Sequence, residues 1–148
     1  MAGYVMEEKK EAIGLKYSST RGNGIQLDSA EAIIQGLAAD GGLFVPDTLP
    51  QVDASFIASL QDLSYEERAE KVLGLFLTDY TADEIKGCVE RAYGHDKFDA
   101  AMRAPVTIFD DISVLELWHG PTSAFKDMAL QLLPQLMSTA LKKTGEAA

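Results

Sequence analysis

Hydrophobic residues recur at helical spacing through most of the chain, and short polar segments separate these runs. Three of the runs begin with a residue that can cap a helix, followed three positions later by a glutamate. The pairs are Asp28 with Glu31, Ser64 with Glu67, and Thr81 with Glu84. We therefore expect helices after residues 28, 64 and 81, the first of them ending at Gly41 or Gly42, and a further helix from about Asp53 to Leu60.

Shorter stretches have the composition of strands. The segment GLFVP predicts a brief strand that Pro46 ends. After Pro105 the runs VTIF and SVLELW are separated by DDI, which fits either a hairpin or two separate sheet strands.

The last predicted helix is the longest, and its apolar residues keep a regular spacing of three and four positions. They are Phe125, Met128, Ala129, Leu132, Leu133, Leu136, Met137, Ala140 and Leu141. Pro134 lies inside this helix and lacks an amide hydrogen, so we expect a kink about one turn earlier. A strand, a turn and a long helix form half of a βαβ unit, which requires a further parallel strand. The pattern therefore predicts an α/β fold in a chain that is truncated.

Composition limits the classes of function. The 148 residues include 47% hydrophobic residues and carry a formal net charge of -10, which disfavours binding to nucleic acids or anionic membranes. The single cysteine, Cys88, cannot form an internal disulfide, is expected to pack in a core, and with two histidines gives no zinc-site spacing. No run is long enough to span a membrane, and the start lacks a signal peptide, so a cytoplasmic location fits best. Met6 is a possible natural start, with residues 1 to 5 as a leader.

One lysine occupies a position that suits chemistry. If Ser123 caps the last helix, Lys126 lies in its first turn, near the positive end of the helix dipole and partly desolvated. Both effects favour the neutral amine that a nucleophile or a proton shuttle needs. The alternative is an ordinary solvated lysine. His119 lies at the end of a predicted strand, where α/β proteins gather their sites, although a packed or capping histidine has the same pattern.

The loop near the start offers groups that bind anions. Arg21 presents a guanidinium beside the hydroxyls of Ser19 and Thr20, a combination suited to phosphate or carboxylate. The alternative is an arginine in an exposed loop.

Three stretches, taken together, resemble the beginning of threonine synthases, which are pyridoxal-phosphate (PLP) enzymes of the fold type II group, similar to tryptophan synthase β. The stretches are YSSTRG, AIIQGLAADGGLFVP and LELWHGPTSAFKD, and they come in the family's order between Tyr17 and Asp127. The element HGPTSAFKD is the most specific of them.

The resemblance implies a role for each matching residue. Lys126 corresponds to the lysine that holds PLP as a Schiff base and then shuttles protons, with Phe125 beside it in the cofactor site. The reaction implied is the conversion of O-phospho-L-homoserine and water to L-threonine and phosphate. The substrate-binding candidates are Ser19, Thr20 and Arg21, and the motif neighbours that shape the lysine's surroundings are His119, Thr122 and Asp127.

The family also implies parts that this chain lacks. Its members run several hundred residues, and neither GNG nor DGG has the strand-to-helix setting of a phosphate-binding loop. We therefore expect a fragment that is inactive alone, with a small N-terminal domain at 1–104 and the start of the PLP-binding domain at 105–148. Its exposed apolar C-terminal helix is expected to promote self-association.

Two alternatives remain open. One is a threonine synthase-like phospholyase, which uses the same cofactor and releases a keto acid. The other is a stand-alone binding or regulatory module that retains the N-terminal fold and tolerates the loss of Lys126.

Overall fold

A computed structural model describes residues 14–22, 24–94 and 96–146 of the protein. The proposed start at Met6 and the leader at 1–5 lie outside these residues. The mixed α/β fold predicted from the sequence is confirmed. The strands are β1 (Tyr17–Ser19), β2 (Gln26–Leu27), β3 (Phe44–Pro46), β4 (Val106–Phe109) and β5 (Ile112–Leu115). The helices are α1 (Ser29–Gln35), α2 (Ala54–Ser59), α3 (Tyr65–Phe76), α4 (Ala82–Tyr93), α5 (Asp127–Leu130) and α6 (Leu133–Thr144).

The four predicted helix starts before residue 100 are confirmed. Helices α1, α3 and α4 each begin with a capping box. The N-cap side chain accepts a hydrogen bond from the backbone amide of the third-position glutamate, and the side chain of this glutamate accepts one from the N-cap amide. Asp53 caps α2 by accepting a bond from the amide of Phe56 at 2.8 Å. The predicted end of α1 at Gly41 or Gly42 is wrong, because Gly36 adopts a φ of 69° and its amide bonds the carbonyl of Ala32.

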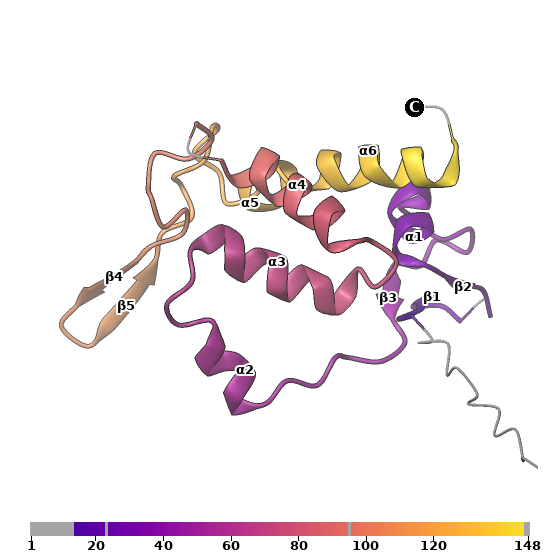
Figure 1. The fold of residues 1–148 in the computed structure, drawn as a ribbon, viewed down its shortest axis with the longest axis horizontal. Helices are drawn as coiled ribbons and strands as arrows, with labels where there is room; N and C mark the ends of the chain where they lie inside the picture. Colours follow the sequence, from indigo (N-terminus) through magenta and orange to yellow (C-terminus); the bar gives the residue numbers. More distant parts are fainter. Residues whose placement is uncertain (1–13, 23, 95, 147–148) are drawn as a thin grey trace, which may run out of the picture.

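Both sheets of the described residues are antiparallel. The first has the order β2-β1-β3, with Ser18 opposite Gln26 on one side and Val45 on the other. The second is the hairpin β4-β5, in which Thr107 lies opposite Val114, so the hairpin alternative is confirmed. Figure 1 shows this hairpin projecting from the helical body, at the end of the molecule opposite to β1 and β2.

The long C-terminal helix is broken into two. It was predicted to start after Ser123, but Ser123 has a φ of 57° and α5 begins only at Asp127. Gln131 and Leu132 separate the two helices and keep helical backbone angles, but the hydrogen-bond pattern changes there, close to the kink expected about one turn before Pro134. Pro134 has no amide hydrogen for the Leu130 carbonyl, and the amide of Leu132 bonds Ala129 instead of Met128.

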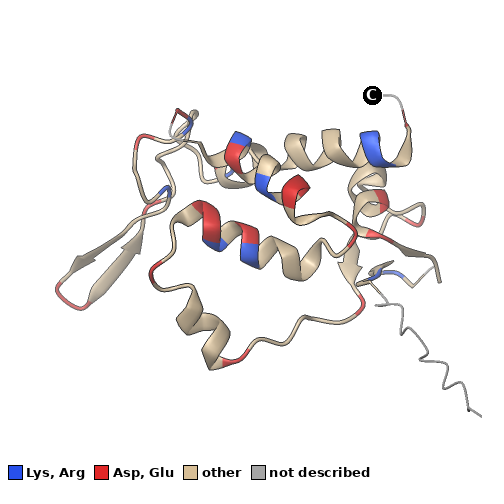
Figure 2. Ribbon diagram, viewed as in Figure 1, with Lys and Arg blue, Asp and Glu red and all other residues tan. Residues whose placement is uncertain are grey.

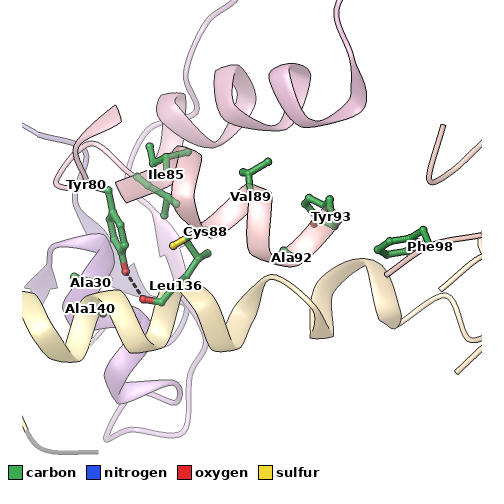
Figure 3. Close-up of a cluster of buried hydrophobic side chains, with 11 residues drawn as sticks. Ala30, Tyr80, Ile85, Cys88, Val89, Ala92, Tyr93, Phe98, Leu136 and Ala140 are labelled. Atoms are coloured by element: carbon green, nitrogen blue, oxygen red, sulfur yellow. Dashed lines mark hydrogen bonds between the residues drawn. The ribbon is translucent and has the colours of Figure 1, made fainter. Parts of the chain in front are cut away.

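The core surrounds α4, which packs against α3 and α6, and α1 packs against α6 (Figure 3). Its predicted apolar face is buried, and Cys88 is fully inaccessible, in agreement with its predicted packing role. In α6, only Leu136 and Ala140 of the predicted stripe are fully covered, and Leu133 remains largely exposed. Full burial of a side chain such as Val89 contributes about 1.5 to 3 kcal/mol. Because α4 carries several such buried side chains, it contributes most to the hydrophobic core.

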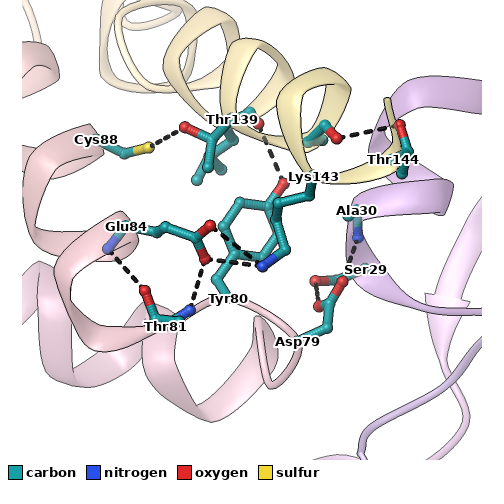
Figure 4. Close-up of polar contacts among 12 residues, drawn as sticks. Ser29, Ala30, Asp79, Tyr80, Thr81, Glu84, Cys88, Thr139, Lys143 and Thr144 are labelled. Atoms are coloured by element: carbon teal, nitrogen blue, oxygen red, sulfur yellow. Dashed lines mark hydrogen bonds and ion pairs between the residues drawn. The ribbon is translucent and has the colours of Figure 1, made fainter. Parts of the chain in front are cut away.

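Polar contacts join α1, α4, α6 and the loop before α4 at one end of the core (Figure 4). Lys143 of α6 pairs with Glu84 of α4 at 2.9 Å, and the Tyr80 hydroxyl donates to the Leu136 carbonyl at 3.1 Å. Asp79 accepts bonds from the Ser29 hydroxyl and the Ala30 amide, which fixes the first turn of α1. These bonds connect α6 to elements before residue 105. The domain boundary at 104/105 stays a prediction.

Acidic side chains are distributed along α1, α3, α4 and the connecting loops (Figure 2). Over the described residues, none of the helices has the length and apolar character needed to cross a bilayer.

Candidate functional site

A tight turn leads from the β4-β5 hairpin to Lys126. The amide of Ser123 bonds the carbonyl of Gly120 at 3.1 Å, and Ser123 takes the left-handed conformation that closes the turn. The amide of Asp127 then bonds the Ala124 carbonyl at 3.0 Å, which starts α5. The turn therefore ends directly at the lysine.

Asp127 holds this turn from inside. Its side chain is 1% exposed and accepts bonds from the Thr122 amide at 2.7 Å and the Thr122 hydroxyl at 2.9 Å. A Cβ atom on Gly120 would lie 2.6 Å from Oδ2 and 2.9 Å from Cγ of Asp127, so only glycine fits beside this carboxylate. These contacts give Gly120, Thr122 and Asp127 of the motif a common structural role.

Lys126 is the N-cap residue of α5, and its carbonyl accepts bonds from the amides of Ala129 and Leu130. Its side chain is exposed, and no hydrogen bond or ion pair to its Nζ is found among the described residues. The expectation of a partly desolvated lysine near a helix dipole is therefore wrong for this chain, since α5 has only four residues. Phe125 beside it is 66% exposed.

His119 precedes the turn and is bonded through both ring nitrogens. Nδ1 lies 2.6 Å from Asp99, and Nε2 lies 2.7 Å from Glu116. The bonds to Glu116 and then to Asp99 raise the pKa of His119, because they favour the imidazolium, which donates from both nitrogens. The backbone of His119 also accepts a bond from the Asp99 amide at 3.1 Å. His119 thus fastens the start of the turn to the 96–103 segment.

Glu116 links the same histidine to the hairpin. It accepts a bond from the Thr107 hydroxyl at 2.5 Å, and this bond, followed by that from His119, lowers the pKa of Glu116. Sequence reasoning did not identify Asp99 or Glu116. Glu116 lies within the quoted motif, but nothing in the pattern pointed to Asp99.

The second group of candidates surrounds Asp40. The Ser19 hydroxyl donates to its carboxylate at 2.7 Å, and Arg21 donates through Nη1 to its backbone carbonyl at 2.9 Å. The Gly42 amide also bonds this carboxylate, and together with Ser19 it lowers the pKa of Asp40. A Cβ on Gly42 would overlap the Ser19 hydroxyl. The serine of YSSTRG therefore leaves no room for a side chain at the second glycine of ADGG.

Thr20 and Arg21 are the exposed members of this group, whereas Ser19 is buried. Figure 1 places β1 below α1, near the C-terminal end of α6, whereas α5 lies before the other end of that helix. The structure therefore brings Ser19, Thr20 and Arg21 together, but it does not bring them to Lys126.

The donor groups at Lys126 fit a carbonyl cofactor better than a metal. The turn offers a free primary amine and an exposed aromatic ring, which suit an aldehyde on an aromatic cofactor. No cluster of three or more His, Cys, Asp or Glu side chains that could hold a metal occurs in the part of the chain that the structure describes.

The fold and this turn define a class of protein. The structure matches the crystal structure of PLP-bound threonine synthase from Brucella melitensis with a TM-score of 0.84 and 41% identity, over 90% of this chain and 29% of that chain. This chain therefore forms part of the fold shared by fold type II PLP-dependent enzymes. A sequence model described as the threonine synthase N terminus matches residues 16–93, and the chain belongs to the threonine synthase family.

Curated relatives agree with this assignment. The chain is 43% identical over 134 residues to threonine synthase from Pseudomonas aeruginosa, covering 89% of this chain and 28% of that protein. It is 40% identical over 139 residues to threonine synthase from Schizosaccharomyces pombe, covering 88% and 26%. The chain therefore spans between a quarter and three tenths of the length of these relatives.

Proposed function

We propose that this chain forms the N-terminal part of a PLP-dependent threonine synthase, which converts O-phospho-L-homoserine and water to L-threonine and phosphate in the cytoplasm. The observation that carries the proposal is the free amine of Lys126 on a turn fixed from both sides, in a chain of this family. By itself the chain is expected to be inactive.

Lys126 is the group that holds the cofactor and later moves a proton at the substrate's α-carbon. Its exposed Nζ is free to form a covalent bond. Its backbone is fixed because its carbonyl accepts hydrogen bonds from two backbone amides of α5. When bound there, PLP would supply the electron sink that makes proton removal from the substrate's α-carbon possible. Phe125 presents an exposed ring next to the amine and is proposed to contact the cofactor.

The motif neighbours act on the position of the amine. Asp127 and Thr122 fix the turn before Lys126, and His119 anchors the start of that turn to Asp99 and Glu116. Accurate placement matters because a misplaced reacting group loses much of the benefit of proximity.

The substrate-binding role of Ser19, Thr20 and Arg21 remains a prediction. The Ser19 hydroxyl is engaged by Asp40, so Thr20 and Arg21 are the side chains that could meet an anion. Their separation from Lys126 does not support simultaneous contact with one substrate within this chain. We expect Arg21→Ala to raise KM for the phosphorylated substrate in the native polypeptide, and an unchanged KM contradicts this role.

We also propose that the 148-residue chain self-associates. Phe125, Leu130 and Leu133 remain 66%, 52% and 45% exposed on the α5-α6 segment. Apolar area of this kind is expected to pair with a second copy when nothing else covers it. Size-exclusion chromatography of the 148-residue chain tests this, and a monomer at high concentration contradicts it.

The test of the function is Lys126→Ala in the native polypeptide, with Lys142→Ala as a matched control at an exposed position of α6. We expect turnover to be lost in the first variant and retained in the second, with both folded. Product analysis separates threonine from the keto acid that a phospholyase would release. Full activity of Lys126→Ala would contradict the role proposed for the lysine, whereas a native polypeptide without turnover would favour the binding or regulatory module.

A further inference from the structure

The break between α5 and α6 leaves the backbone carbonyl of Met128 without its helical partner, as Pro134 does that of Leu130. In a continuous helix the amide of Leu132 would bond the carbonyl of Met128, but here it bonds Ala129 at 3.1 Å. Among the described residues, no other backbone amide donates to Met128. The hydroxyl of Tyr93 donates to this carbonyl instead, at 2.7 Å.

Tyr93 reaches Met128 from a rigid position at the end of α4. Its side chain is 5% exposed, and its ring packs edge-on against Tyr65 at 5.1 Å and beside Phe98 at 5.9 Å. Its own carbonyl accepts a bond from Nε of the buried Arg103 at 2.7 Å. Figure 3 shows Tyr93 and Phe98 at the end of the hydrophobic cluster. The hydroxyl is therefore a fixed point in the core.

Met128 follows Lys126 by two residues within a single helical turn. The Lys126 carbonyl accepts bonds from the amides of Ala129 and Leu130, so the position of the turn determines the position of the lysine backbone. A helix of four residues has no independent stability. It depends on tertiary contacts, and on its C-terminal side the bond from Tyr93 is the polar contact that joins it to α4.

We propose that Tyr93 is a positioning residue for Lys126: its hydroxyl holds the Met128 carbonyl and thereby fixes α5 and the lysine against the core. The proposal rests on the proposed function of Lys126 for its catalytic consequence. The mechanical link between Tyr93 and α5 is independent of that function.

Tyr80 provides a matched control. It is 6% exposed, and its hydroxyl donates at 3.1 Å to the carbonyl of Leu136 in the interior of α6 (Figure 3). The helical ladder supplies a backbone donor there as well, so loss of the hydroxyl leaves that carbonyl bonded. Tyr93→Phe and Tyr80→Phe therefore remove the same group from equally buried rings, but only the first frees α5.

Amide hydrogen exchange in the native polypeptide tests the link directly. We expect Tyr93→Phe to speed exchange at residues 127–131 roughly fivefold to tenfold, as the loss of one hydrogen bond predicts, and Tyr80→Phe to leave these amides unchanged. Equal exchange at 127–131 in the two variants, or no change in Tyr93→Phe, would overturn the proposal.

Kinetics of the loaded enzyme test the consequence. Tyr93→Phe is expected to lower kcat roughly tenfold with little change in KM, because the amine is displaced and the substrate pocket is not, whereas Tyr80→Phe keeps kcat. A kcat equal in both variants overturns the positioning role. If Lys126→Ala retains turnover, the proposed role of Lys126 fails, and the exchange comparison still decides whether Tyr93 holds α5.

Discussion

Replacing Gly120 with alanine is the sharpest test of the turn that carries Lys126. The new methyl group would meet the buried Asp127 side chain, 2.6 Å from Oδ2 and 2.9 Å from Cγ. Both distances are well below van der Waals contact, so Asp127 must move. Any movement weakens the bonds that its carboxylate accepts from the amide and the hydroxyl of Thr122.

The magnitude follows from these contacts. Loss of one hydrogen bond to a charged acceptor costs about 1.5 to 3 kcal/mol, and overpacking in a well-filled site costs about 1 to 3 kcal/mol. We expect Gly120→Ala to lower the free energy of unfolding by about 2.5 to 6 kcal/mol, the sum of the two effects. This is a large part of the total stability of a domain of this size.

Urea unfolding of matched variants measures the effect. Gly74→Ala is the control, because Gly74 lies in α3 with nothing within 4 Å of an added Cβ. It should be stabilising by about 0.5 to 1 kcal/mol, as expected for alanine in a helix. In an Asp127→Gly background the cost of Gly120→Ala should fall sharply, since the Cβ atom and the carboxylate that clash with the new methyl group are both gone. An unchanged cost in that background would refute the reasoning.

Two further predictions concern the neighbours of Lys126. Asp127→Asn leaves one acceptor oxygen for the two donors of Thr122, so urea unfolding should show a loss of about 1 to 3 kcal/mol, and an unchanged midpoint contradicts this. The contribution of His119, whose folded pKa is raised above its ordinary value of 6.5, should be fully present below about pH 6 and lost as the pH rises through the folded pKa. The stability difference between the wild type and His119→Gln should therefore shrink as the pH rises from about 6 towards the alkaline range. A difference independent of pH contradicts the assignment.

The helix starts could be predicted from the sequence because their causes are local. An N-cap and its glutamate lie three residues apart, so Ser64 with Glu67 and Thr81 with Glu84 are visible in the sequence itself. The buried face of α4 could be predicted for the same reason, since one helix carries the whole pattern.

The end of α1 and the start of α5 depend on contacts that the sequence pattern does not show. Gly36 ends α1 earlier than expected, although the apolar pattern continues to Leu37. Ser123 looks like an N-cap, yet Asp127 reaches back to Thr122 and forces Ser123 into a left-handed turn. The preference of serine for capping was overridden by a side-chain contact between residues five positions apart within the same turn.

The lysine of the site was identified from its motif, but its surroundings were not. His119 and Asp99 are 20 residues apart, and Ser19 and Asp40 are 21 apart, so only the folded chain brings them together. The Tyr93 to Met128 bond spans 35 residues and arises from a helix break whose carbonyl needs a donor. Such pairs have no sequence periodicity that could indicate them.

The central claim is that Lys126 is the cofactor lysine, and reductive trapping tests it most directly. The native polypeptide carrying this segment is treated with borohydride, digested, and searched by mass spectrometry for the lysine that carries the reduced pyridoxyl group. The account predicts the label on the peptide that contains Lys126, and its loss in Lys126→Ala. A label on another lysine, with Lys126 unmodified, would contradict it.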